Sequence, residues 1–381
     1  MNDISASFLS EQEVMIRDSA RKVAAEVVAT TAAERDRTSA WPHNELKAVG
    51  DLGFMGMLTP EAYGGSGASF VEYCLAIQEF AGADAGFATL MHVHNSVGFM
   101  ISRAGNEDQK REFLPRLASG EHIGAFLLTE PHAGSDTAAF RTTARREGDH
   151  YVVNGSKQFI SNGSEAGVGL VLAVTDKPSG KNGSSLLIVN AKDPGYKVAR
   201  VEDKLGQRSA HVAQIQLDEC RVPVEHVLGE EGSGYKRIMA SLSEGRVAIA
   251  AVAIGAARAA LDAAVKYAKE REAYGAPIFK LQGVGFDLAD MATQVEVAQQ
   301  FMLYAARLCD AGLPCAKEAS MAKLFASEMA EKVCSDALQI HGGYGYVTDF
   351  PVERYYRDVR VTKIYEGTSH IQKLIIARSL D

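Results

Sequence analysis

The chain has 381 residues, 46% of them hydrophobic, so it can bury cores in two or three domains. Its formal net charge is −8 with a pI near 5.8, and its Lys and Arg are scattered, which excludes a basic surface for nucleic acid. The five cysteines are odd in number and far apart in the sequence, and they form no CxxC pair, so we expect reduced thiols and no bound metal.

The first 120 residues show a helical pattern that begins at Ser10, where Glu13 has the spacing of a capping box. Residues 121–234 instead carry short β-rich runs separated by Asn, Gly, Asp and Pro turns. From residue 235 onward, apolar and small residues recur at helical spacing. The sequence therefore predicts an α+β chain of three domains: helical (1–120), β-barrel-like or β-sandwich (121–234), and a C-terminal four-helix bundle (235–381).

The longest apolar run, residues 247–257, is far shorter than the ~20 residues that cross a bilayer. The N-terminus has three acids before any basic residue and no apolar segment, which argues against a targeting peptide. We therefore expect no membrane span and a cytoplasmic location.

Several common catalytic motifs are absent. Neither GxGxxG nor GxxxxGK[ST] occurs, and the glycine-rich string YGGSGAS follows a helical stretch rather than a strand. His92 and His94 have no carboxylate at ligand spacing, which favours core or pocket-wall histidines over metal ligands. A nicotinamide enzyme, a nucleotide kinase and a serine hydrolase are all disfavoured.

Eight short strings resemble the acyl-CoA dehydrogenase family and occur in that family's order along nearly the whole chain. They are LGFMGMLTPEAYGGSG, AFLLTEPHAGSD, NGSKQFISNG, DKLGQRSAHVAQIQLDECRVP, SEGRVAIAA, EREAYGAPI, QIHGGYGY and RYYRDVRVTKIYEGTSHIQ. The resemblance implies the fold of that family and FAD-dependent α,β-dehydrogenation of an acyl-CoA thioester to the 2-enoyl-CoA. It also implies a homotetramer, arranged as a dimer of dimers, that passes electrons to an electron-transfer flavoprotein.

The resemblance assigns cofactor contacts to the loop at 126–135, to the turn at 159–161 and to C-terminal segments. Arg271 and the 339–343 segment would reach the FAD pyrophosphate of a neighbouring subunit. On residue type alone, the first loop is an ordinary turn, Phe159 could fill the core, and Arg271 could be a surface residue. The assigned residues are Phe126, Leu128, Thr129, Gly134, Ser135, Phe159, Ile160, Ser161, Arg271, Tyr274, Gln282, Gln339, Gly342, Gly343, Thr368 and His370.

The IYEGT segment contains Glu366, which the resemblance identifies as the base that removes the α-proton while flavin N5 accepts the β-hydride. Its backbone N–H and a flavin ribityl hydroxyl would bind the thioester oxygen. Local spacing offers a structural alternative, in which Ser369 and Gln372 form a capping box and the acid only precedes a helix. Further substrate contacts are implied for Ser135, Ser243, Arg246, Tyr365 as an apolar wall, and Gly367.

Some family members carry the base on the helix that here contains Gly245, and Glu244, one residue earlier, would point about 100° away. Arg246 could alternatively be a buried ion-pair partner. Two alternative functions remain at this stage: a flavoenzyme of the same fold with altered chemistry, such as an oxidase or a desulfinase, and a non-catalytic acyl-CoA-binding flavoprotein. The sequence does not specify the acyl group.

Overall fold

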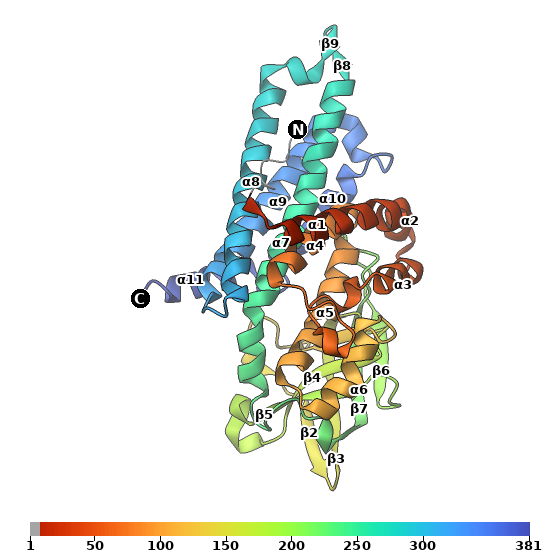
Figure 1. The fold of residues 1–381 in the computed structure, drawn as a ribbon, viewed down its shortest axis with the longest axis vertical. Helices are drawn as coiled ribbons and strands as arrows, with labels where there is room; N and C mark the ends of the chain where they lie inside the picture. The colour runs from red at the N-terminus through yellow and green to blue at the C-terminus, as the bar shows by residue number, and fades with distance from the viewer. Residues whose placement is uncertain (1–7) are drawn as a thin grey trace.

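The N-terminal part of the chain is helical, and the computed structural model describes residues 8–381 (Figure 1). As predicted, Ser10 and Glu13 form a capping box at the first helix. A π-helical turn, Ala24–Val28, separates the first two helices. The helices of this part are α1 Glu11–Val23, α2 Ala29–Thr38, α3 His43–Asp51, α4 Phe70–Ala83, α5 Ala85–Ala104 and α6 Glu107–Ala118.

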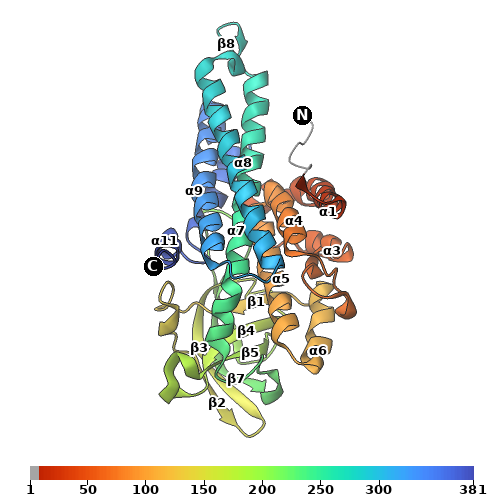
Figure 2. The same cartoon turned by 60° about the vertical axis from the view of Figure 1, so that its left-hand side comes forward.

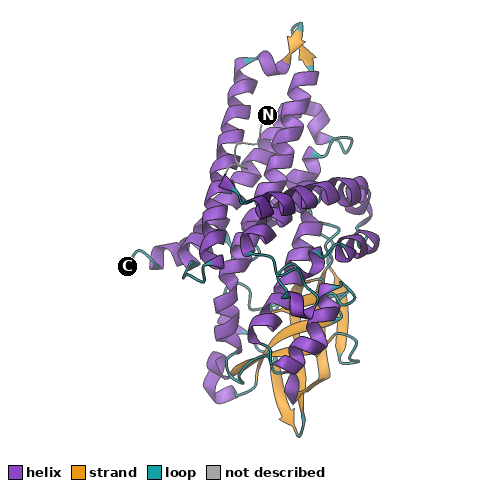
Figure 3. Cartoon of the chain, in the orientation of Figure 1, coloured by secondary structure: helices purple, strands orange, loops and turns teal. Residues whose placement is uncertain are grey.

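The middle of the chain forms a mixed seven-stranded sheet with the order β1-β4-β2-β3-β7-β6, in which β5 pairs with β4 (Figure 3). The strand β1 runs parallel to β4, whereas the long strands β3 and β7 are antiparallel. Buried side chains alternate along β7, as expected for a strand with one wet face. The strands are β1 Gly124–Leu127, β2 Thr143–Glu147, β3 His150–Ser161, β4 Val168–Val174, β5 Ser184–Asn190, β6 Tyr196–Val201 and β7 Val212–Pro223.

The C-terminal part is a helical bundle whose longest helix, α7, runs from the sheet to the far tip of the molecule (Figure 2). The predicted α+β fold class is confirmed. A short hairpin, β8 Glu272–Ala273 and β9 Ala276–Pro277, caps that tip. The helices are α7 Gly234–Glu270, α8 Gln282–Asp310, α9 Ala316–His341, α10 Val352–Val359 and α11 Ser369–Arg378.

The helices of both ends of the chain share one apolar core, to which α4, α7, α8 and α9 contribute. By length and composition α7 could cross a membrane, but 78% of its most apolar window is buried inside the protein. Its alanines and Gly255 let neighbouring helices approach closely. Helix α7 is therefore the central helix of a packed core, which explains its unusual hydrophobicity.

Helix α4 crosses α7 at Gly255, and a Cβ atom there would lie 2.2 Å from the carbonyl oxygen of Gln78. Gly255→Ala should therefore force the two helices apart and lower the free energy of unfolding by about 1–3 kcal/mol. Denaturant-induced loss of helical circular dichroism measures this change. In the matched control Gly285→Ala on α8, the nearest atom lies 3.9 Å away, and stability should be unchanged or slightly raised. Equal destabilisation by both changes would contradict the close-crossing explanation.

Candidate active site

Glu366 lies in the short loop between the turn Arg360–Lys363 and α11, and its backbone is left-handed. Its φ is 52° and that of Gly367 is 90°, a conformation that costs energy for a residue with a side chain. Two buried side chains stabilise it: Gln372 Nε2 donates to the carbonyl oxygens of Glu366 (3.0 Å) and Gly367 (2.8 Å), and Lys323 Nζ donates to that of Gly367 (2.7 Å). The loop is thus held from two helices.

These contacts correct the capping box predicted for the start of α11. Thr368, not Ser369, is the N-cap residue, and its hydroxyl accepts from the amide of Ile371. Gln372 donates instead to the two carbonyls of the Glu366 loop. The sequence has the S-x-x-Q spacing of a capping box, but the side-chain amide of Gln372 is engaged by the carbonyl groups of the left-handed loop.

The carboxylate of Glu366 faces α7 at Gly245, where a Cβ atom would lie only 2.8 Å from Glu366 Oε2. The neighbouring acid, Glu244, forms an ion pair of 3.0 Å with Arg103. Position 245 therefore has to be a glycine for this carboxylate to take this place, and Glu244 is engaged elsewhere.

Burial raises the pKa of Glu366, and the positive charges of Arg246 and Lys323 oppose that rise. Arg246 is itself buried, and its Nε has no hydrogen-bond partner within residues 8–381. Burial also lowers the pKa of Lys323 to about 8. The site therefore contains a carboxylate made more basic by burial and kept ionisable by two cations.

Tyr365, predicted from the sequence to be an apolar wall, is a hydrogen-bonded group. Its hydroxyl lies 3.2 Å from Thr89 Oγ1 on α5 and accepts from Gln207 Nε2 at 3.2 Å. The backbone N–H of Gln207 donates to the buried carboxyl of Asp358 on α10. The sequence interpretation of Tyr365 as a purely apolar wall was incomplete, because Thr89 and Gln207 are distant in sequence and form no motif with it.

The loop at 126–135 follows β1 and is anchored beneath the sheet by a buried ion pair. Lys157 Nζ lies 2.9 Å from Glu130 Oε1 and also donates to the carbonyl of Leu172. The amide of Gln158 donates to the carbonyl of Thr129 at 2.9 Å. Phe126 and Leu128 pack against the core, whereas Gly134 and Ser135 are exposed.

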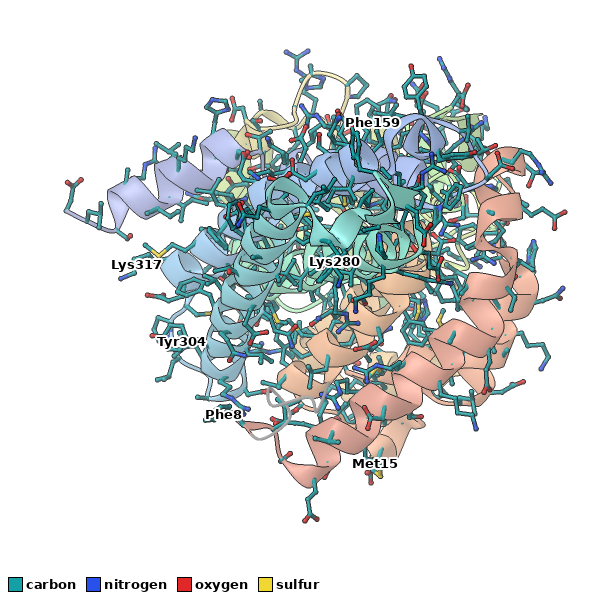
Figure 4. All side chains as sticks on the ribbon, turned by 90° about the horizontal axis from the view of Figure 1, so that it is seen from above. Phe8, Met15, Phe159, Lys280, Tyr304 and Lys317 are labelled. Carbon is teal, nitrogen blue, oxygen red and sulfur yellow. The ribbon has the colours of Figure 1, made fainter. Side chains whose placement is uncertain are left out.

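Residues 159–161 form the end of β3, at an irregularity in its pairing with β7, and present an aromatic ring to solvent. Phe159 has a φ of 57° and a side chain that is 64% exposed, so the interpretation as core filling was wrong (Figure 4). The side chain of Ile160 is buried in the β-sheet core, so only its backbone can contact a ligand there. No hydrogen-bond partner for the hydroxyls of Thr129, Ser135 or Ser161 exists in the described part of the chain.

A second group of predicted residues lies at the opposite end of α7. Arg271 ends that helix, stacks over Tyr344 with 5.8 Å between guanidinium and ring centre, and lines a cavity of about 500 Å³. This cavity is also lined by Tyr267, Ile278, the 340–343 segment and Val347. At 1.5 Å per residue, Arg271 is roughly 39 Å along the helix from Gly245. Tyr274 and Gln282 lie on the same tip, and Tyr274 is 95% exposed.

Other predicted residues lie near Glu366 or in the core. Ser243 is half-buried on α7, Thr368 caps α11 and His370 is exposed on that helix. His94 is a core residue: Nε2 lies 3.0 Å from the carbonyls of Met55 and Leu117, and Nδ1 accepts from the amide of Gly124. His92 lies 3.1 Å from the hydroxyl of Tyr73. The five cysteines are free thiols, and Cys309 and Cys315 lie 3.3 Å apart.

Comparison with known proteins identifies the class to which this fold and this arrangement of residues belong. Family descriptions match residues 10–121, 125–220 and 232–380 as the acyl-CoA dehydrogenase N-terminal, middle and C-terminal domains. The chain belongs to the acyl-CoA dehydrogenase family and is an oxidoreductase of that family.

The relatives align over nearly the whole chain. An acyl-CoA dehydrogenase of Bacillus subtilis is 46% identical over 98% of both chains. The mouse mitochondrial short-chain specific acyl-CoA dehydrogenase is 44% identical over 98% of this chain and 90% of its own. A solved structure from a study of the electron transferring flavoprotein of Acidaminococcus fermentans superposes with a TM-score of 0.96 at 43% identity over 98% of both chains.

FAD is the cofactor of this family, and a glutaryl-CoA dehydrogenase from Mycobacterium smegmatis was solved with FADH2 (31% identity, TM-score 0.92, 98% of this chain and 95% of that chain). The residues present fit a flavin. Free hydroxyls at Thr129, Ser135 and Ser161 suit a polar ring edge, and the exposed ring of Phe159 suits an aromatic face. Gly134 has open space around it, as backbone contact with a cofactor requires.

The packing of Glu366 against Gly245 generates a prediction. Gly245→Ala should displace the carboxylate and slow the bleaching of the flavin by acyl-CoA roughly 100-fold, because catalytic groups tolerate only about 1 Å of misplacement. Anaerobic stopped-flow absorbance measures the rate. The adjacent change Glu244→Gln, which breaks only the pair with Arg103, should leave the rate within about threefold. An unaffected Gly245→Ala enzyme would show that Glu366 acts from another position.

Proposed function

We propose that this protein catalyses FAD-dependent α,β-dehydrogenation of an acyl-CoA thioester to the 2-enoyl-CoA, with Glu366 as the base for the α-proton. The observation that carries the proposal is the placement of Glu366: a carboxylate of raised pKa, on a loop held in a strained conformation, against Gly245 of α7, where no side chain blocks it. Backbone strain at a residue that also has a shifted pKa is typical of a functional site.

The chemistry requires a base and a partner for the thioester oxygen. A proton α to a thioester is weakly acidic, so the base has to be basic and close, and the developing negative charge needs hydrogen-bond donors. The backbone N–H of Glu366 has no partner within residues 8–381 and is available for that oxygen. An acyl chain that excludes water from the site would raise the pKa of Glu366 further.

FAD, when bound, supplies the hydride acceptor. We propose that the 126–135 loop and residues 159–161 at the end of β3 hold the flavin ring of FAD. The distal residues Arg271, Gln339, Gly342 and Gly343 would hold the pyrophosphate of a flavin in a second subunit, because roughly 39 Å of helix separates Arg271 from Gly245. A cofactor site divided between subunits requires an oligomer, and we propose a homotetramer arranged as a dimer of dimers. We also propose three domains, at 1–120, 121–234 and 235–381.

The partner and substrate proposals rest on the relatives. The solved structure from the electron transferring flavoprotein study supports such a flavoprotein as electron acceptor. The mouse relative is named for short-chain acyl-CoA, so a short acyl group is the first substrate to test. Oxidase or desulfinase chemistry and a non-catalytic binding role are the alternatives, and a cytoplasmic location stays a prediction.

The decisive test is the anaerobic visible spectrum of the purified protein during addition of short, medium, branched, aromatic and dicarboxylic acyl-CoAs, one at a time. One acyl class should bleach the yellow flavin. Glu366→Gln should stay yellow and lose bleaching by a factor of 10² to 10⁴, since that is the contribution of a positioned base.

Glu244→Gln is the matched control, because it removes a neighbouring acid that faces Arg103. A wild-type protein that no acyl-CoA bleaches would favour altered chemistry. A Glu366→Gln variant that is bleached at the wild-type rate would refute the assignment of the base.

A further inference from the structure

Two lysines in the described part of the chain are fully buried, and their surroundings differ. Lys157, in the β domain, has a carboxylate partner, Glu130, at 2.9 Å. Lys323, on α9, has no carboxylate within ion-pair distance among residues 8–381, and its ammonium group donates to the carbonyl of Gly367 at 2.7 Å. A buried ammonium group without a close counter-ion is costly, so packing alone does not account for Lys323.

The ammonium group of Lys323 lies beside the catalytic loop. It shares the carbonyl of Gly367 with Gln372 Nε2, which donates at 2.8 Å. These two side chains come from α9 and α11, and together they hold the left-handed pair Glu366 and Gly367. Gln372 contributes hydrogen bonds without charge, whereas Lys323 contributes both.

We propose, on the basis of the function proposed above, that Lys323 is a positioning residue for Glu366: its ammonium group fixes the main chain of the loop, and its charge keeps the buried carboxylate ionised before substrate binds. The carboxylate must be ionised to accept a proton, and an apolar pocket opposes ionisation. Lys323 donates to a main-chain carbonyl of the loop. Its positive charge therefore stabilises the ionised carboxylate without a hydrogen bond to the carboxylate oxygens.

The charged groups around Glu366 come from two helices. Arg246 on α7 and Lys323 on α9 both stabilise the ionised carboxylate. Glu328, farther along α9, acts on Lys323, but it is also paired with Lys363. The hydroxyl of Tyr365 is engaged by Thr89 and Gln207. Removal of Lys323 therefore leaves Arg246 as the single cation that acts on Glu366 among the described residues.

The test measures the Glu366 carboxyl directly, in the FAD-loaded protein without substrate. Infrared difference titration against Glu366→Gln isolates its carboxyl band. Lys323→Gln keeps a hydrogen-bond donor but removes the charge, and it should raise the pKa of Glu366 by roughly one unit, the low end of the effect of a nearby opposite charge. The acid limb of kcat/KM, which reports the free enzyme's base, should move to higher pH by the same amount.

Gln372→Leu is the matched control, because it removes two hydrogen bonds from the same loop and no charge. It should slow flavin bleaching and leave the pKa of Glu366 within about 0.3 units of wild type, since no nearby charge changes. If Lys323→Gln does not fold, the same titration is carried out on Lys323→Met, which also lacks the charge.

An unshifted carboxyl in the neutral variant, or an equal shift in Gln372→Leu, would overturn the proposal. The infrared result does not depend on turnover. Failure of every acyl-CoA to bleach the flavin would therefore count against the proposed function, and an unshifted carboxyl would count against the role of Lys323.

Discussion

The whole candidate site depends on one constraint, the left-handed backbone of Glu366 and Gly367. A carboxylate on an ordinary helix or turn would not face Gly245 at this distance, because the side-chain direction follows from the backbone. The conformation is unfavourable locally, so the surrounding protein has to maintain it. Buried donors from α9 and α11 do so by engaging both carbonyls of the loop, which leaves the amide of Glu366 free for a ligand.

The length of α7 sets the second constraint. The same helix presents Gly245 and Arg246 to Glu366 and carries Arg271 to the tip of the molecule (Figure 2). The distance of roughly 39 Å between Gly245 and Arg271 along this helix is the reason that the proposed cofactor site is divided between subunits. Close packing of α4 against Gly255 keeps α7 straight and central, and thereby links core packing to the arrangement of the site.

The fold class predicted from the sequence is confirmed and the site segments stay predictions, but the sequence did not indicate how the side chains meet. Motifs located Glu366, the 126–135 loop and the tip residues, because each is a short, contiguous string. Lys323 and Gln207 went unnoticed because they act across long sequence separations. On α9, Lys323 lies in a string of small and apolar residues, MAKLFAS, and this position was the signal available in the sequence. The structure shows that Lys323 is fully buried. The error at Phe159 arose because the backbone there is left-handed. The error at Ser369 arose because the Gln372 side chain donates to the Glu366 loop instead of capping the helix.

The arrangement of charge around Glu366 also suits the order of events in the proposed proton abstraction. Before substrate binds, the carboxylate has to be ionised in a pocket that disfavours charge, and cations on two helices favour that state. After an acyl chain excludes water, the same carboxylate has to become a stronger base, which requires that no cation be bonded to its oxygens. Within residues 8–381 Lys323 donates to a main-chain carbonyl, and no hydrogen bond joins Arg246 to Glu366. Charge held nearby but not in contact allows both states, because its influence is weakened with distance while the carboxylate oxygens stay free.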